Sequence, residues 1–385
     1  MEPRGYSQQE CRITAHMAGV GCAGRGLAGR EMSAAPISVH FVEPGGQGGV
    51  FQHTAEVARL IVEDGGRAVL HTSADREPLE FGDIVVCGCV KWYRDTTPRA
   101  LRYFQIVFGY LFLTLPHLSA ETKGRIVHLH GLFKSPLYAM TLWLLRLRAE
   151  RVVFSPHNTF SRAGRRWEAR TLQWAMRRTD IAVCYSNFDA EHVRPWGVEA
   201  VVCPLVMWMP ETTLDDIAEW RTRLSEGSSS VIILMAGQIR ADKGIDQMIL
   251  AAPLITVPFK FAVVGEDKGH LEYCREIANR TGVEVVWMNE YFTTSEIASA
   301  IAAADVVVLP YSQASQSAVA VLANAVGTPT VAYPVGGVPE LATVTTSQAN
   351  PRALAEGIMR VITTQDWCIR EPVEGLGPYE GVYGS

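Results

Sequence analysis

The feature that most constrains this chain is a regular alternation of short strand-like runs with helix-like stretches. The strand-like runs of a first series are rich in β-branched residues: ISVHFV, RAVLHT, DIVVCG, RIVHLH, RVVFSP, DIAVCYS and AVVCP. Stretches with helical spacing, such as TAEVARLIVEDG and SPLYAMTLWLLRLRAE, separate them. This alternation predicts a parallel sheet covered by helices.

A break in the alternation divides the chain into two domains. After Pro204 the segment VMWMPETTLDDIAEWRTRLSEGSSS is polar and then Ser-rich, which is typical of a connection. A second series follows it: VIILMAG, FKFAVVG, VEVVWM, DVVVLP and PTVAYP. A chain of 385 residues with 48% hydrophobic content is long enough for two cores. We therefore predict an α/β fold of two Rossmann-like parallel-sheet domains, residues 34–205 and 206–350, facing across a cleft.

The two ends and one apolar stretch are interpreted separately. Residues 1–33 have no sustained apolar period, which predicts a disordered extension and no signal peptide. Residues 351–385 are expected to form a C-terminal helix and tail that return to the N-terminal domain. The apolar stretch 103–118 is shorter than the ~20 residues of a membrane span, so we predict a buried or surface-lying helix. We expect a cytoplasmic protein and leave contact with the inner face of the membrane open.

Charge and cysteine spacing exclude several classes of function. The net charge of −5 gives no general reason to expect nucleic-acid binding. Among eight scattered cysteines only Cys87 and Cys89 are close together, and no Cys-x2-Cys pair or histidine cluster has metal-ligand spacing. We therefore expect inert, reduced thiols, no metal site and no cofactor.

Two loops carry the signals of anion binding. The stretch EPGGQGGVFQHT places Gly46, Gly48 and Gly49 between a strand and a helix start, whose free N–H groups favour an anion; a tight turn without a ligand fits equally well. The stretch GQIRADKGID places Arg240 and Lys243 after a strand of the second series. Two cations there suit a diphosphate, with a solvated basic loop as the alternative.

The start of a later helix in the second series has no charged residue. It consists of Ser315, Gln316, Ser317, Ala318 and Val319. A bound phosphate requires such a site, because the helix dipole and the hydroxyl groups attract an anion and a carboxylate would repel it.

Histidines follow two strands of the first series. Of His128 and His130, we expect only one to face the loop opening and favour His130 as the functional residue. His157 and Asn158 follow another strand and are weaker candidates for a functional site, as is Arg162. An arginine-rich segment suits an anionic lipid headgroup or another phosphorylated molecule, although a solvated helix face explains it as well.

Six motifs occur in a fixed order along the chain: the Gly-Gly loop, VHLHG, SPHNTFS, GQIRADKGID, FAVVGE and ADVVVLPYSQASQSAVAVLANAVGTPTVAYPVGGVPE. In this order they resemble the family 4 glycosyltransferases, which are retaining enzymes of the GT-B fold. The resemblance covers residues 34–341. It implies metal-independent, hexosyltransferase-like transfer from a nucleotide-diphospho-sugar to an unidentified acceptor, which is a glycan, a lipid-linked molecule or a small molecule. It also implies that His130 lies near the transferred sugar, that Arg240 and Lys243 bind the diphosphate and that the Gly46–Gly49 loop reaches the donor phosphates. His157, Asn158 and Arg162 are then weaker candidates for the acceptor side.

The chain departs from the usual family pattern at several positions. By register, the two carboxylates of the Glu-x7-Glu pair are replaced by Ala314 and Leu322. Gln238 stands where an arginine is usual, and Ala318 replaces a customary glycine. The chain therefore resembles a branch that lacks the pair. Another GT-B enzyme, such as a nucleotide-sugar epimerase or a phosphorylase, and a catalytically degenerate nucleotide-sugar-binding protein remain alternatives.

Overall fold

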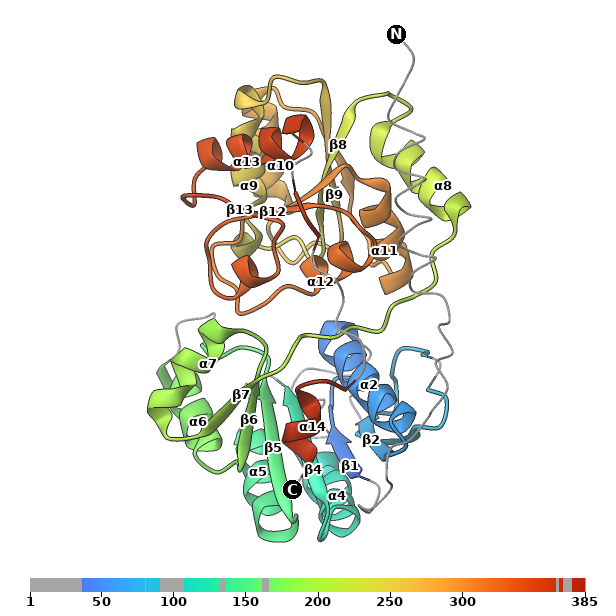
Figure 1. Cartoon of the computed structure of the whole chain (residues 1–385), viewed down its shortest axis with the longest axis vertical. Coiled ribbons are helices and arrows are strands. Elements are labelled where there is room, and N and C mark those ends of the chain that lie inside the picture. The colour runs from blue at the N-terminus through green and yellow to red at the C-terminus, as the bar shows by residue number, and fades with distance from the viewer. Residues whose placement is uncertain are drawn as a thin grey trace. The chain divides into compact units, whose positions relative to one another are not determined.

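The computed structural model describes residues 37–79, 81–90, 107–131, 136–160, 166–364, 367–369 and 376–384. They form two compact units. Of the described residues, the N-terminal unit contains those from 37 to 208 together with 376–384, and the C-terminal unit contains residues 209–364 and 367–369. Figure 1 labels the elements of both units.

The N-terminal unit is built on a seven-stranded sheet of order β3-β2-β1-β4-β5-β6-β7, in which every pairing is parallel. Its strands are β1 Ser38–Val42, β2 Arg67–Ser73, β3 Val85–Val90, β4 Ile126–Gly131, β5 Arg151–Pro156, β6 Ile181–Cys184 and β7 Glu199–Val202. Its helices are α2 Gly48–Glu63, the π-helical turn η1 Tyr110–Thr114, α4 Leu115–Glu121, α5 Pro136–Arg148, α6 Arg166–Met176, α7 Asn187–Val193, η2 Arg194–Trp196 and α14 Tyr379–Tyr383.

The C-terminal unit has a six-stranded parallel sheet of order β10-β9-β8-β11-β12-β13. Its strands are β8 Val231–Ala236, β9 Phe259–Val264, β10 Val285–Met288, β11 Val306–Leu309, β12 Thr330–Ala332 and β13 Val344–Thr345. Its helices are α8 Leu214–Ser225, η3 Ala241–Lys243, α9 Ile245–Ala251, η4 Ala252–Leu254, α10 Leu271–Thr281, α11 Thr294–Ala303, α12 Ala318–Ala325, η5 Val338–Glu340 and α13 Pro351–Thr364.

The central strands of each sheet are buried, as the sequence predicts. Along β8, Ile232 and Leu234 pack into one core cluster, whereas Ile233 and Met235 pack into another. Successive strand residues point to opposite faces, so a run of consecutive apolar residues fits a strand with helices on both sides. The predicted runs of both series lie on strands, and β13 is a short strand that the sequence analysis did not predict.

The chain crosses between the units more than once. Helix α13, which the sequence analysis grouped with the tail, packs on α9 and β12 of the C-terminal unit. Helix α14 belongs to the N-terminal unit and lies beside its strands in Figure 1. The Tyr383 hydroxyl of α14 is 2.6 Å from Nδ1 of His128 on β4, a contact between residues 255 positions apart.

The apolar stretch 103–118 is helical where the structure describes it. Phe108, Phe112 and Leu113 are exposed, whereas Leu115 and Leu118 are buried. Within the described residues, no helix is long and apolar enough to cross a membrane.

Candidate functional site

The loop that follows β8 carries the two cations predicted to bind a diphosphate. Nε and Nη2 of Arg240 donate to the two carboxylate oxygens of Asp242 at 2.8 and 2.7 Å, and Nη1 donates to Oε1 of Gln238 at 3.1 Å. Nζ of Lys243 lies 3.8 Å from the centroid of the Tyr311 ring. Both cations are therefore held in defined positions beside the end of β11.

Backbone contacts fix this loop against the segment that follows β11. The amide of Ser312 donates to the Asp242 carbonyl oxygen at 3.0 Å. Gly244 has a φ of +69°, and a Cβ at this position would lie 2.0 Å from the carbonyl oxygen of Pro310. Only glycine allows this close approach, so the basic loop and the β11–α12 loop form one surface.

Ser317 is the N-cap of α12. Its Oγ accepts a hydrogen bond from the Ala320 amide at 3.2 Å and lies 3.4 Å from the Tyr311 hydroxyl. The first amides of a helix have no partner within the helix, so this end presents donors and a positive dipole. The start of α12 also lies beside the end of β8, because a Cβ on Gly237 would be 3.7 Å from Cγ2 of Val319.

Residues 336 and 337 pack against the loop that precedes α12. The amide of Gly337 donates to the Ser315 carbonyl at 3.1 Å, and a Cβ on Gly336 would lie 1.6 Å from the Ala314 carbonyl oxygen. The buried hydroxyl of Ser315 has no hydrogen-bond partner in the described part of the chain. Gln316 lies between the two serines on the same loop.

The C-terminal unit thus brings the predicted donor residues together. Arg240, Lys243 and the start of α12 lie at the carboxyl ends of β8 and β11, which are neighbours in the sheet. Ala314 and Leu322, which replace the family's carboxylates, are buried in the apolar core. The carboxylate of Asp242, on the same loop, is paired with Arg240. This surface is suited to an anion with two or more charged oxygens.

The glycine-rich loop of the N-terminal unit differs from expectation. Gly45 and Gly46 donate their amides to the buried carboxylate of Glu43 at 2.9 and 2.7 Å, and Gly48 donates to Oε1 of Glu77 at 3.2 Å. Burial raises the pKa of Glu43 to about 7, although hydrogen bonds from the Gly45 and Gly46 amides and from Thr72 oppose the rise. The amides of Gly46 and Gly48, which the sequence analysis assigned to the donor phosphates, therefore donate to carboxylates of the chain itself. Gly49 lies in the first turn of α2.

His128 and His130 lie on the same face of β4, so the expectation that only one of them faces the opening is wrong. Their ring centroids are 4.0 Å apart, because residues two apart in a strand point the same way. His130 is fully buried, and its Nδ1 is 3.3 Å from Nε2 of His157. Its Nε2 has no hydrogen-bond partner among the described residues. The weaker candidate Asn158 follows β5 beside His157, and Arg162 lies outside the described residues.

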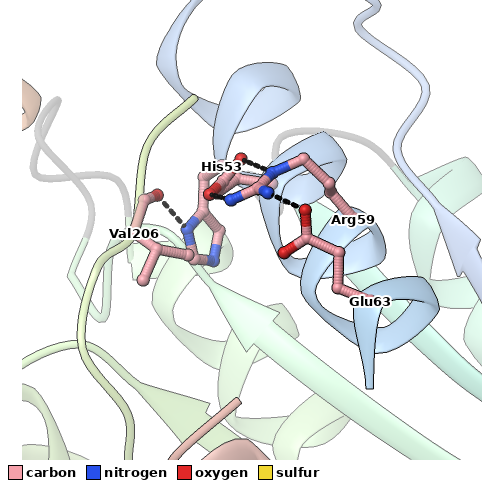
Figure 2. A network of polar contacts seen from close by, with 5 residues as sticks. His53, Arg59, Glu63 and Val206 are labelled. Carbon is pink, nitrogen blue, oxygen red and sulfur yellow. Dashed lines mark hydrogen bonds and ion pairs between the residues drawn. The ribbon is translucent and has the colours of Figure 1, made fainter. Parts of the chain in front are cut away.

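His53 joins these residues from α2, and sequence reasoning missed it. Nδ1 of His53 contacts the Val206 carbonyl at 2.6 Å, as Figure 2 shows. On the same helix, Arg59 pairs with Glu56 and Glu63. We name the buried group the His–Tyr cluster; its members are His53, His128, His130, His157, Tyr185, Tyr379 and Tyr383.

A second group that sequence reasoning missed lies at the edge of the N-terminal sheet. His71, Cys87, Cys89 and His117 come together there, although the cysteine spacing led us to expect no metal site. The available signal was the Cys-x-Cys pair, because residues two apart in a strand share a face. The two histidines are distant in sequence, so only the fold reveals the group.

Two family models match the chain in succession. Residues 47–205 match "Glycosyltransferase Family 4", and residues 230–364 match "Glycosyl transferases group 1". A D-inositol 3-phosphate glycosyltransferase of Xylanimonas cellulosilytica is 32% identical over 158 residues, which are 40% of this chain. An uncharacterised glycosyltransferase of Methanocaldococcus jannaschii is 30% identical over 148 residues, or 36% of this chain. In both cases the matched region spans 37% of the relative.

Solved structures with the same fold cover far more of the chain. Sucrose-phosphate synthase of Thermosynechococcus elongatus has a TM-score of 0.66 and 17% identity, covering 85% of this chain and 90% of its own. Anabaena HepE in complex with UDP and glucose has a TM-score of 0.66 and 18% identity, covering 86% and 91%. With the two parallel-sheet units, these neighbours confirm the predicted GT-B fold.

Proposed function

We propose that this chain, which belongs to the family 4 glycosyltransferases, transfers a sugar from a nucleotide-diphospho-sugar to an acceptor with retention of anomeric configuration. The observation that carries the proposal is the surface of the C-terminal unit where Arg240, Lys243 and the start of α12 meet. We assign it to the donor diphosphate, because it offers cationic side chains, a hydroxyl group and helix amides in one place.

The leaving diphosphate gains negative charge as the bond to the sugar breaks, so fixed cations lower the barrier most when they are held in place beforehand. Arg240 is oriented by Asp242 and Gln238, and Lys243 is positioned on the ring of Tyr311. In this mechanism the diphosphate accepts the acceptor's proton, so no protein carboxylate is required as a base. The absence of the Glu-x7-Glu pair is therefore compatible with transfer.

The first test measures binding of nucleoside diphosphates and their release from nucleotide-sugars. UDP and UDP-sugars are tried first, because structures of HepE contain UDP and UDP-glucose. Charge-assisted contacts contribute about 1.5–3 kcal/mol each, so Arg240→Ala and Lys243→Ala should each weaken diphosphate affinity by at least about tenfold. The control is Lys260→Ala on β9, whose ammonium pairs with Glu226 and Glu284.

The control variant should bind the diphosphate as the wild type does. Unchanged affinity in both Arg240→Ala and Lys243→Ala would show that the diphosphate binds elsewhere. Acceptors are then screened as donor turnover is followed, and D-inositol 3-phosphate is included because a curated relative is named for it. Failure of every nucleotide-sugar to bind or to release its diphosphate would contradict the proposed function.

We propose that His130 acts on the transferred sugar through Nε2, the nitrogen without a hydrogen-bond partner in the described residues. Its side chain is fully buried, so this contact requires neighbouring segments to move. His130→Gln should lower turnover by about 10- to 100-fold, as expected when one fixed polar contact to a transition state is lost, and leave diphosphate affinity within about twofold.

The matched variant is His128→Gln, on the same strand face. Both nitrogens of His128 have partners, the Tyr383 hydroxyl at 2.6 Å and the Ser155 hydroxyl at 2.7 Å. This change should therefore lower the melting temperature more than turnover per folded molecule. Equal turnover in His130→Gln and wild type would assign His130 a structural role.

A further inference from the structure

We infer that the N-terminal unit binds a divalent metal ion of the zinc class between β2, β3 and α4, with His71, Cys87, Cys89 and His117 as its four ligands. One potential ligand atom from each residue, a thiol sulfur or an imidazole nitrogen, lies within 4.8 Å of all the others. Two sulfurs and two nitrogens are a ligand set that zinc commonly takes in proteins, whereas calcium and magnesium take oxygen ligands.

Pairing at the edge of the sheet places the first three ligands. Strand β3 is the edge strand, and Cys87 lies directly opposite His71 on β2. The register then shifts, because the next paired residues are Ser73 and Val90, so β3 contains one extra residue here. Such an irregularity re-aims side chains. At this position it allows Cys89 to reach the same point as Cys87 and His71.

The fourth ligand comes from a helix that is attached to the same strand. The Thr114 hydroxyl, at the end of the π-helical turn, donates to the Cys89 carbonyl at 2.9 Å. His117 is three residues further along, and residues three apart share a helix face. The contact that joins Thr114 to β3 therefore also directs His117 toward the thiols, and its Nε2 is 3.3 Å from Sγ of Cys87.

The hydrogen bonds of His71 have the arrangement expected of a metal ligand. Its Nε2 is 3.0 Å from Nδ1 of His40, and its Nδ1 is buried without a hydrogen-bond partner in the described part of the chain. Histidines that bind metals through one nitrogen usually donate the other N–H to a second polar group. In this site His71 would bind the metal through Nδ1 and donate from Nε2 to His40.

The separation of one sulfur and one nitrogen ligand is already close to that around a bound tetrahedral ion. With Zn–S near 2.3 Å and Zn–N near 2.0–2.1 Å, a sulfur and a nitrogen ligand are separated by about 3.6 Å, against 3.3 Å between Cys87 and His117. Four protein ligands leave no position for water or substrate, which is the pattern of a structural site. Binding replaces the proton of each thiol by the metal and ties the edge strand to α4.

The test uses the purified full chain and Co²⁺ or Zn²⁺ alone. After removal of metal by a chelator, one equivalent of Co²⁺ should give the visible absorption of a tetrahedral ion and the near-ultraviolet charge-transfer band of thiolate ligands. Zn²⁺ should abolish both signals by displacement. Zn²⁺ should also raise the melting temperature, because a ligand that binds only the folded state stabilises it.

Variants show whether Co²⁺ binds at this site or at other thiols and histidines of the chain. Cys87→Ser and His117→Gln should each lower Co²⁺ affinity by at least about tenfold, in line with the loss of a ligand. The controls Cys368→Ser and His192→Gln, which change an exposed thiol and an exposed histidine, should retain the full signal. Absence of a thiolate–Co²⁺ band in the wild type, or a band of equal strength in Cys87→Ser, would overturn the inference. A Cys87–Cys89 disulfide in protein purified under reducing conditions would overturn it as well.

Discussion

At the scale of single residues, substitutions of Ser317 can distinguish its role as a helix cap from its proposed role in anion binding. Its Oγ caps α12 by accepting from the Ala320 amide, and it lies at the proposed phosphate position. Asp caps a helix as well as Ser does, but it adds a negative charge at the dipole end that a phosphate would occupy. The two functions of this residue therefore respond differently to substitution.

We predict that Ser317→Asp keeps the melting temperature near that of the wild type and weakens diphosphate binding by at least about tenfold. Ser317→Ala should instead lower the free energy of unfolding by about 1 kcal/mol. It should change diphosphate affinity less than Ser317→Asp does, because the backbone amides remain. Calorimetric titration with the diphosphate and thermal melting measure both quantities. Diphosphate binding by Ser317→Asp as strong as that of the wild type would exclude a phosphate from this helix start.

Single residues also show how far sequence reasoning reaches. Arg240 and Lys243 could be proposed from sequence because both lie in one short loop after a predicted strand, and their role stays a prediction. Glu43 was overlooked, although it immediately precedes the glycine-rich loop, because sequence alone does not show that its carboxylate turns back to accept the Gly45 and Gly46 amides. The metal ligands His71 and His117 are separated by 46 positions and by β3, so no local spacing relates them.

At the scale of elements, the position of η3 against the end of β11 depends on Gly244. Its φ of +69° is unfavourable for other residues, and the Pro310 carbonyl leaves no space for a Cβ. Gly227 has a similar φ of +76°, but no atom lies within 4 Å of the position that its Cβ would take. Substituting each of these two glycines by alanine therefore distinguishes the free energy lost through backbone strain, at Gly227, from that lost through strain and a steric clash together, at Gly244.

We predict that Gly227→Ala lowers the free energy of unfolding by roughly 1 kcal/mol, the usual cost of a left-handed conformation for a residue with a side chain. Gly244→Ala should cost at least about twice as much, and it should also weaken diphosphate binding because the loop with Arg240 and Lys243 must shift. Urea unfolding and diphosphate titration test this. Equal effects of the two substitutions on both measurements would contradict the contact with Pro310.

Element prediction was most successful where apolar residues run without interruption. The strand-like runs at the centre of each sheet, on β1, β4, β8 and β11, are buried along almost their whole length, so the same residues that favour a strand also form the core. Strand β13 was missed because it has only two residues, Val344 and Thr345, and is held by pairing with β12. We predicted that residues 351–385 return to the N-terminal domain, but the contact that α14 makes there, with His128 255 positions away, has no signal in the sequence.

At the scale of the whole molecule, buried titratable groups are distributed unequally between the two units. The histidines of the His–Tyr cluster all belong to the N-terminal unit, and the C-terminal unit has a single histidine, His270, which is partly exposed. Burial lowers the pKa of His53 to about 4. Burial also lowers the pKa values of His128, His130 and His157 well below 6.5, and neighbouring imidazoles lower them further.

These shifts have a definite sign. Below pH 6.5 the unfolded histidines take up protons that the folded cluster cannot accept, so stability that is present above pH 6.5 is lost as the pH falls. Between pH 7.5 and 5.5 each of the four costs on the order of 1 kcal/mol. Glu43 acts in the opposite direction, because its raised pKa of about 7 lets the folded unit bind a proton in this range and recovers about 2 kcal/mol. The four histidines therefore outweigh Glu43.

We predict that acidification from pH 7.5 to 5.5 destabilises the N-terminal unit by several kcal/mol and the C-terminal unit by less than about 1 kcal/mol. Hydrogen exchange measured by mass spectrometry, corrected for the intrinsic pH dependence of exchange, compares peptides from β4 and β5 with peptides from β8 and β9. Glu43→Gln removes the opposing group, so its N-terminal unit should lose roughly 2 kcal/mol more than the wild type over the same range. Equal losses in the two units would show that the cluster histidines become protonated without unfolding, as they would if water reached them in the folded protein.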